Sequence, residues 1–215
     1  MQMNQIGDVV RAALEGRRLL QHPFYRRWEA GDLEFAELGP YASQYSHFER
    51  MLPDVLQTVA TRLPDGAPRH MVLANLADEM ENPLPHVELF AEFEEAVGAQ
   101  ESPPTPATSK LLSLYRTSAM GEPMNALAVL AAYEVQSSEI ARSKAEGLRS
   151  HYGLDDSETS FWDVHATLEE DHASWTLKAM CGAPEADSIF QSSRASADAW
   201  WEFLDEREAA KSMLG

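Results

Sequence analysis

Apolar side chains recur at intervals of three and four residues along most of the chain, and this spacing constrains the fold more than any other feature. The first apolar stripe consists of Ile6, Val9, Val10, Ala13 and Leu14. Residues spaced in this way share one face of an α-helix, so each such segment must bury that face against another helix. Strand-like alternation is missing. The pattern predicts an all-α protein.

Prolines and glycines divide the chain into predicted helices with short connections between them. Ser157 or Thr159 is the expected N-cap of the second-last helix, and Trp200 marks the last one. The predicted segments are 6–14, a short piece ending at Gly31-Asp32, 33–62 with bends near Pro40 and Pro53, 67–81, 86–98, 109–120, 123–150, 158–180 and a final amphipathic helix. Seven or eight such helices predict one up-and-down bundle that spans residues 1–215 as a single domain.

Charge and composition exclude several classes of protein. The net charge of -18 argues against a nucleic-acid partner, because phosphate binding needs clustered Lys and Arg. No apolar run approaches the roughly 18–20 residues that a membrane span needs. The amphipathic N-terminus carries Asp8, which is not typical of a secretory signal. Cys181 stands alone, so we expect an inert, partly buried thiol in a cytoplasmic protein without an internal disulfide.

A group of ligand-type side chains lies in the segment 161–175. His165, Glu169 and His172 follow the spacing HxxxExxH, so all three project from one face of the predicted helix. Apolar residues border that face and indicate that it points inward. Burying two imidazoles and a carboxylate is costly unless a metal ion or mutual hydrogen bonds compensate. Glu170 and Asp171 point elsewhere and are expected at the surface.

Two other predicted helices carry acids on apolar faces. Glu79 lies near the end of one helix, and His86 follows it after two prolines, so one segment can present both groups. Glu134 follows the apolar run 127–133 and must be paired or bound to a metal. By contrast, Glu139 and Glu146 have polar neighbours and read as surface residues.

Together these side chains supply three carboxylates and three imidazoles. Helical bundles that bind two irons commonly use inward Glu and His residues from four helices. Oxygen-rich ligation with imidazole suits iron or manganese, and zinc is less apt without a thiolate. Open coordination positions would make the chemistry oxidative. The alternative is that the same groups only hydrogen-bond one another across the bundle.

This set of residues resembles the haem-oxygenase-like diiron oxidase superfamily, which shares a seven-helix (TenA/PqqC-like) bundle. Its members typically bind metal through E-x6-H, a lone Glu on a later helix, and HxxxDxxH. The matching positions here are Glu79 with His86, then Glu134, and the group formed by His165, Glu169 and His172. The chain departs from the pattern at Glu169, where most members carry Asp. Glu in place of Asp keeps the negative charge and makes the side chain one methylene longer.

Within that superfamily the likeness is strongest to the para-aminobenzoate synthases that include the chlamydial death-domain-associating protein. It covers His22 to about Trp175 and includes HPFYRRWEAGDL, the Tyr133-Glu134 pair and Lys144. The resemblance implies a reaction in which Tyr25 donates the aromatic ring, Lys144 donates the amine and Tyr133 assists beside the metals. It also implies two metal ions (Fe/Fe or Fe/Mn), molecular oxygen, an external reductant and about one turnover per chain.

Packing offers a simpler interpretation of the same residues. Tyr25 and Tyr133 have apolar neighbours and could be core residues whose hydroxyls are hydrogen-bonded. Lys144 lies about three turns beyond Tyr133, roughly 16 Å along a straight helix, so spacing alone does not bring it to the metals.

Three other functions remain open from the sequence. One is a diiron oxygenase that acts on an external amino acid, amine or fatty acid, with the same ligands and no role for Tyr25. Another is a metal-free relative, either thiaminase-like or quinone-cofactor-forming, although Cys181 is poorly placed for the thiol chemistry of the former. The third is a protein-binding module, although no feature of the sequence indicates a binding surface. The helix with Trp200 and Trp201 could pack on the core or on a second copy in a homodimer.

Overall fold

The computed structural model describes residues 1–81, 83–182 and 185–211, apart from the side chain of Glu170. The described residues form helices and no strand. The α-helices are α1 (Met3–Ala13), α2 (Pro23–Ala30), α3 (Phe35–Arg62), α4 (Ala67–Glu81), α5 (His86–Ala96), α6 (Pro106–Met120), α7 (Pro123–Gly147), α8 (Ser160–Ala179) and α9 (Ala186–Ala210). A 3₁₀ turn covers Leu19–Gln21 and a π-helical turn covers Leu148–Tyr152. The all-α prediction is confirmed.

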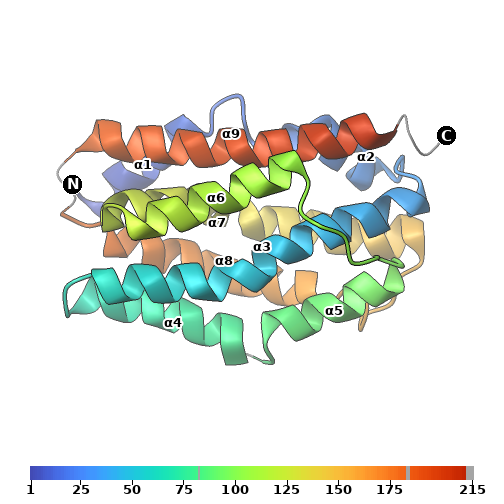
Figure 1. Cartoon of the computed structure of the whole chain (residues 1–215), viewed down its shortest axis with the longest axis horizontal. Helices are drawn as coiled ribbons and strands as arrows, with labels where there is room; N and C mark the ends of the chain where they lie inside the picture. The colour runs from blue at the N-terminus through green and yellow to red at the C-terminus, as the bar shows by residue number, and fades with distance from the viewer. Residues whose placement is uncertain (82, 183–184, 212–215) are drawn as a thin grey trace.

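The long helices run roughly along the longest axis of the molecule (Figure 1). In that view α9 lies along the top, α4 and α5 lie along the bottom, and α3 crosses diagonally between them. Helix α7 packs most extensively against α8 and α9. This central place explains its sequence, because nearly every residue from Ala126 to Glu134 is buried and no face is left for solvent.

Most helix boundaries agree with the sequence prediction, with a few instructive differences. Helix α6 starts at Pro106, earlier than expected, because a proline fits the first helical turn, where its missing N–H costs nothing. Thr159 does occupy the N-cap position of α8, but its hydroxyl donates to the Asp155 carbonyl oxygen and does not cap the helix. The expected stops at Asn82 and Pro184 lie outside the described residues.

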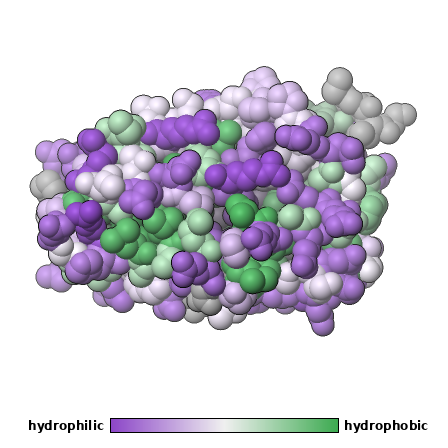
Figure 2. All heavy atoms as spheres, turned by 60° about the horizontal axis from the view of Figure 1, so that its bottom comes forward, coloured by the Kyte–Doolittle hydropathy of each residue, from purple (hydrophilic) through white to green (hydrophobic). Residues whose placement is uncertain are grey.

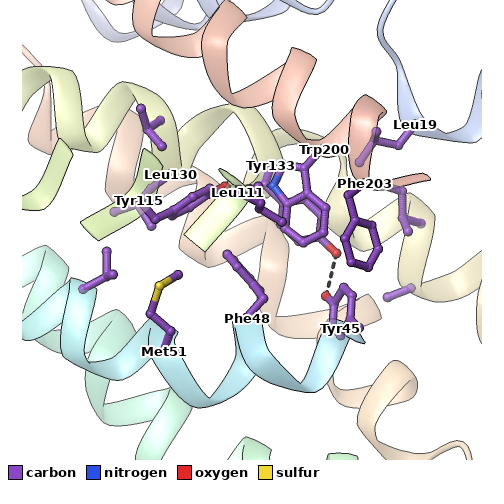
Figure 3. Close-up of a cluster of buried hydrophobic side chains, with 14 of the residues drawn as sticks. Leu19, Tyr45, Phe48, Met51, Leu111, Tyr115, Leu130, Tyr133, Trp200 and Phe203 are labelled. Carbon is purple, nitrogen blue, oxygen red and sulfur yellow. Dashed lines mark hydrogen bonds between the residues drawn. The ribbon is translucent and has the colours of Figure 1, made fainter. Parts of the chain in front are cut away.

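An aromatic cluster fills the middle of the bundle (Figure 3). Tyr133 stacks on Trp200 with ring centroids 4.5 Å apart, and Phe48 meets the same indole edge-on at 4.8 Å. Tyr45 and Tyr133 share a hydrogen bond of 2.7 Å between their hydroxyls, drawn as a dashed line in Figure 3. Trp200 therefore packs on the core of its own chain. The neighbouring Trp201 is half-buried and meets the His22 ring edge-on.

The surface is mostly hydrophilic, as the net charge predicts. Figure 2 brings the bottom of Figure 1 forward and shows hydrophobic side chains gathered in separate groups among hydrophilic ones. Large exposed apolar residues near the α4–α5 turn include Met80, Leu84 and Val87. Within the described residues, no helix has the length and apolar character needed to cross a membrane. The prediction of a partly buried thiol is wrong, because Cys181 is exposed just after the end of α8.

Candidate metal centre and the buried lysine

Helix α8 directs its predicted ligands into the bundle. His165, Glu169 and His172 are all at most 5% exposed. The His165 Nδ1 lies 2.8 Å from the Phe161 carbonyl oxygen, so this nitrogen carries the proton and donates. The other ring nitrogen, Nε2, then has a free lone pair and lies 3.9 Å from the Glu169 Oε1. A backbone acceptor on one imidazole nitrogen is the usual way in which a metal-binding histidine is oriented.

The end of α4 and the start of α5 bring in Glu79 and His86. Helices α4 and α5 follow one another along the bottom of the bundle, and the His86 Nδ1 lies 2.8 Å from the Glu79 Oε2 (Figure 1). Both side chains are buried. The second Glu79 oxygen lies 3.9 Å from the His172 Nδ1. Glu79 therefore stands between the α5 histidine and the α8 histidine.

Two groups of potential ligand atoms fall close enough together to hold a metal ion. One consists of Glu79, His86 and His165, and the other consists of Glu79, Glu169 and His172. Within each group the candidate ligand atoms lie within 4.8 Å of one another. Glu79 belongs to both groups, which is the arrangement that a carboxylate between two metal positions would have.

Glu134 reaches the same cavity from α7 and completes the set of predicted ligands. Its Oε1 accepts a hydrogen bond of 2.9 Å from the Asn75 amide, and its buried Oε2 makes no hydrogen bond with the described residues. The neighbouring Ser137 hydroxyl donates to the Glu169 Oε2 at 2.7 Å. These polar neighbours orient both carboxylates while leaving one oxygen of Glu134 available to a metal.

Sequence reasoning missed one acid in this cavity, Glu49 of α3. It is 3% exposed, and its Oε2 has no hydrogen-bond partner among the described residues. The signal that could have found it is its spacing. Tyr41, Tyr45 and Glu49 follow one another at intervals of four, so they share one inward face of α3.

The buried carboxyl groups repel one another, and burial disfavours their charged forms. Burial, opposed by Asn75 and Thr176, raises the pKa of Glu134 to about 7. Burial and the nearby Glu79 charge raise the pKa of Glu49 to about 8. The pKa of Glu169 is raised well above its usual value by burial and by Glu134.

The histidines complete the case for a bound cation. Burial and the neighbouring His86 lower the pKa of His165 to about 3, so its imidazole is neutral. In the metal-free site, burial disfavours the ionised form of Glu49, Glu134 and Glu169, and a nearby cation would stabilise that form. Bound metal ions would supply the missing positive charge, and both donor types suit iron or manganese. The residues present therefore fit a metal cofactor.

Lys144 lies in a second buried site, at the other end of the same inward face of α7. Its amine is 1% exposed and donates to the Tyr41 hydroxyl at 2.6 Å. The amine lies 3.9 Å from the Trp162 ring centroid, 4.7 Å from that of Tyr45 and 4.8 Å from that of Tyr25. Burial lowers the pKa of Lys144 well below its usual value, with only the charge of Glu49 opposing it.

Close packing of α7 against α2 fixes this lysine. Gly147 permits that approach, because a Cβ at this position would lie 2.9 Å from the Trp28 ring. The Trp28 indole N–H donates to the Lys144 carbonyl oxygen at 3.3 Å. The turn of helix that carries the amine is thereby held against the helix that carries Tyr25.

A continuous set of tyrosines links Lys144 to the metal-type cavity. The Tyr25 and Tyr41 hydroxyls are hydrogen-bonded at 2.9 Å, and Tyr41 stacks on Tyr45 with ring centroids 5.7 Å apart. Tyr45 is in turn hydrogen-bonded to Tyr133, and both line the cavity with the predicted ligands. Tyr25 itself does not line that cavity. Lys144 is therefore connected to the cavity through the rings of Tyr41 and Tyr45, although it lies about three helical turns from Tyr133 along α7.

The cavity beside the predicted ligands is small. Its volume is about 20 Å³, which is room for about one water molecule. Its walls are ligand side chains, tyrosines and apolar residues such as Phe48 and Leu130.

Residues 40–201 match the haem-oxygenase-related family described as iron-containing redox enzymes. The chain therefore belongs to this family of iron-containing redox enzymes: it is an oxidoreductase with a metal cofactor that acts on small molecules.

Curated relatives cover nearly the whole chain. The 4-aminobenzoate synthase of Nitrosomonas europaea is 33% identical over 95% of this chain and 92% of its own length. The 4-aminobenzoate synthase of Chlamydia pneumoniae is 28% identical over 89% of each protein. The 4-chloro-allylglycine synthase of Streptantibioticus cattleyicolor is 26% identical over 80% of this chain and 69% of its own length.

Solved structures support the same fold. A protein of unknown function with a heme oxygenase-like fold from Shewanella denitrificans covers 100% of this chain, and the chain covers 95% of it, with a TM-score of 0.80 and 17% identity. The TenA homologue from P. horikoshii covers 94% of this chain, which in turn covers 97% of it, with a TM-score of 0.77 and 16% identity. The haem-oxygenase-like bundle predicted from the sequence is confirmed.

Proposed function

We propose that this protein makes 4-aminobenzoate from its own Tyr25, with Lys144 as the source of nitrogen. The relatives named 4-aminobenzoate synthase support the product. The observation that carries the choice of residues is the position of the Lys144 amine, 4.8 Å from the Tyr25 ring centroid and enclosed by aromatic rings. A lysine without a carboxylate partner is costly to bury, and a purely structural role would not need it.

The predicted metal ligands are Glu79, His86, Glu134, His165, Glu169 and His172, which would hold two ions, Fe/Fe or Fe/Mn. When bound, these ions supply the redox chemistry with molecular oxygen and an external reductant. The shared position of Glu79 in both candidate groups supports a dinuclear centre. Anomalous scattering at the iron and manganese edges of crystals of the loaded protein would identify the ion at each position.

The chain's own residues perform four tasks in this reaction. Burial lowers the pKa of Lys144 well below its usual value and so favours the neutral amine, whose lone pair can form a bond. Burial also raises the pKa of Tyr25, so its hydroxyl stays protonated until the ring is oxidised. Tyr41 holds both groups, since it accepts from Lys144 and is hydrogen-bonded to Tyr25. The pair of Tyr45 and Tyr133 can pass an electron and a proton between Tyr25 and the centre.

Isotope labelling and mass spectrometry test this proposal. Protein labelled with ¹³C in its tyrosines and ¹⁵N in its lysines is loaded with Fe²⁺ and Mn²⁺ and exposed to oxygen with a reductant. We expect up to about one doubly labelled 4-aminobenzoate per chain, with mass lost from the peptide that contains Tyr25 and altered mass at Lys144. The control is Tyr152→Phe, which removes a tyrosine hydroxyl that lies outside both the cavity and this chain of rings.

The competing function is oxidation of an external amino acid, amine or fatty acid. The cavity of about 20 Å³ opposes it, because such molecules need far more room than one water molecule. Many turnovers on an added substrate by a chain of unchanged mass would contradict self-sacrifice. Inside the cell, the reduced iron that this chemistry needs fits a cytoplasmic location, and fractionation of cells would test that location.

A further inference from the structure

A second hollow reaches the predicted metal ligands from outside the bundle. It has a volume of about 310 Å³ and lies between α1, α7 and α8. Met3 and Arg11 of α1 lie on one side, and Ser138 of α7 and Ser174 of α8 lie on the others. Glu134 and Glu169 also line it. We call this hollow the outer cleft.

The same two carboxylates line the small inner cavity. They therefore form the partition between the outer cleft and the interior. The exposed fractions agree with this position, because Glu134 at 9% is the most exposed of the predicted ligands, whereas His86 and His172 are at 1%. The other walls of the inner cavity include Tyr45, Phe48 and Leu52, which a hydrated ion would not cross.

We infer that the outer cleft is the route by which divalent metal ions enter the centre. This inference rests on the proposed ligands but not on the tyrosine chemistry. A hydrated cation must exchange its waters for protein oxygens in steps, and carboxylates at the end of a wet cleft provide the first such oxygens. The buried Oε2 of Glu134, which lacks a hydrogen-bond partner among the described residues, is available for this exchange.

Arg11 is a basic side chain at the entrance of the outer cleft. Its guanidinium folds back over Gly7 and bonds to the Asp8 carboxylate at 2.7 Å. Because the Arg11 side chain lines the cleft, its positive charge opposes the approach of a cation. Removing that charge should therefore accelerate metal uptake without changing the ligands.

Uptake of Co²⁺ by metal-free protein, followed by the visible absorption of the bound ion, tests the route. Ser174→Trp places a large ring in the cleft, and we expect uptake to slow about tenfold or more while the final metal content stays unchanged. Thr167→Trp is the matched control, because Thr167 lies on the same helix, is exposed and does not line the cleft. Equal uptake rates in Ser174→Trp and the wild type would overturn the inference.

A reversible plug covers the case in which Ser174→Trp does not fold. In a Cys181→Ser background, Ser174→Cys carries a bulky mixed disulfide that dithiothreitol removes. We expect slow uptake before reduction and wild-type uptake after it, and unchanged kinetics on reduction would contradict the route. In every variant, absence of bound metal at equilibrium would count against the proposed ligands, whereas slow uptake to full occupancy supports the route alone.

The charge at the entrance gives an independent measurement. Arg11→Gln should raise the Co²⁺ uptake rate several-fold at low salt, and the difference should shrink as NaCl screens the field. Arg116→Gln removes an exposed charge on α6, away from the cleft, and should leave the rate unchanged. Slower uptake by Arg11→Gln, or the same acceleration in both variants, would contradict entry past Arg11.

Discussion

The metal-type cavity and the lysine site are both buried in the same bundle, yet they differ in the charged groups that they contain. The cavity gathers Glu49, Glu79, Glu134 and Glu169, and its acids repel one another. The lysine site holds one amine among aromatic rings. Bound cations would stabilise the ionised acids of the cavity, whereas burial lowers the pKa of Lys144 and so favours its uncharged amine. Helix α7 carries Glu134 at one site and Lys144 at the other.

The different charges of the two sites explain why they are separate. A lysine next to four carboxylates would be held as an ammonium ion and could not form a bond to carbon. The rings of Tyr41 and Tyr45 keep the amine near Tyr25, at a distance from most of the acids, while still connecting the two regions. The separation therefore makes the proposed chemistry feasible at both ends.

The largest effect is expected at the lysine site. Tyr25→Phe and Lys144→Met should each abolish 4-aminobenzoate formation, because the first removes the phenol hydroxyl that makes the ring oxidisable and the second removes the nitrogen source. Lys144→Met should also raise the free energy of unfolding, by about 1 kcal/mol, since a polar amine leaves an apolar cage. Product assay, metal content and urea unfolding check these outcomes. Product at the wild-type level from either variant would end the self-sacrifice hypothesis.

The next effect is on metal binding in the cavity. His165→Ala or Glu169→Ala should weaken metal affinity by at least about 100-fold, because even an outer-shell change costs roughly 10–100-fold. Glu169→Asp keeps the charge and should retain full metal content. Metal titration monitored by elemental analysis distinguishes the two. If Glu169→Asp loses metal as completely as Glu169→Ala, the length of the side chain at position 169 matters more for metal binding than its charge.

A smaller effect is expected at the link between the regions. Tyr45→Phe removes the hydrogen bond to Tyr133 and should cost about 1 kcal/mol of stability. It should slow product formation several-fold while metal content stays unchanged. Single-turnover kinetics measure the rate. An unchanged rate would show that the two regions communicate by another path.

The smallest effect is a difference in pH dependence. In metal-free protein, the pKa of Glu134 (about 7) and that of Glu49 (about 8) lie above the usual 4.5, so their stabilising contribution is present at low pH and is lost as pH rises through 7–8. Lys144 has a lowered pKa, so its contribution instead grows as pH rises. Lys144→Met removes this opposing rise, so its stability should fall more steeply than that of the wild type between about pH 5 and pH 10. Thermal unfolding across this range measures the slope, and a shallower slope in Lys144→Met would contradict the assignment.

The sequence by itself determined the helical fold and the inward position of the predicted ligands. Helical periodicity is a local property, and His165, Glu169 and His172 share a face of α8 because of the helix repeat alone. The burial of Glu134 likewise followed from the apolar run before it. The exposure of Cys181 was misjudged, because burial just beyond the end of a helix depends on what packs there.

Only the tertiary structure decided what meets across helices. Glu49 escaped notice because nothing within α3 shows that its neighbour will be Glu79 of α4. Lys144 looked too far from the metals along its own helix, yet rings from α2 and α3 fill the space between the two sites. The contacts that matter to the proposed chemistry join residues as far apart as Tyr41 and Lys144 in the chain. Such contacts depend on how whole helices pack, which the spacing of residues along one helix does not specify.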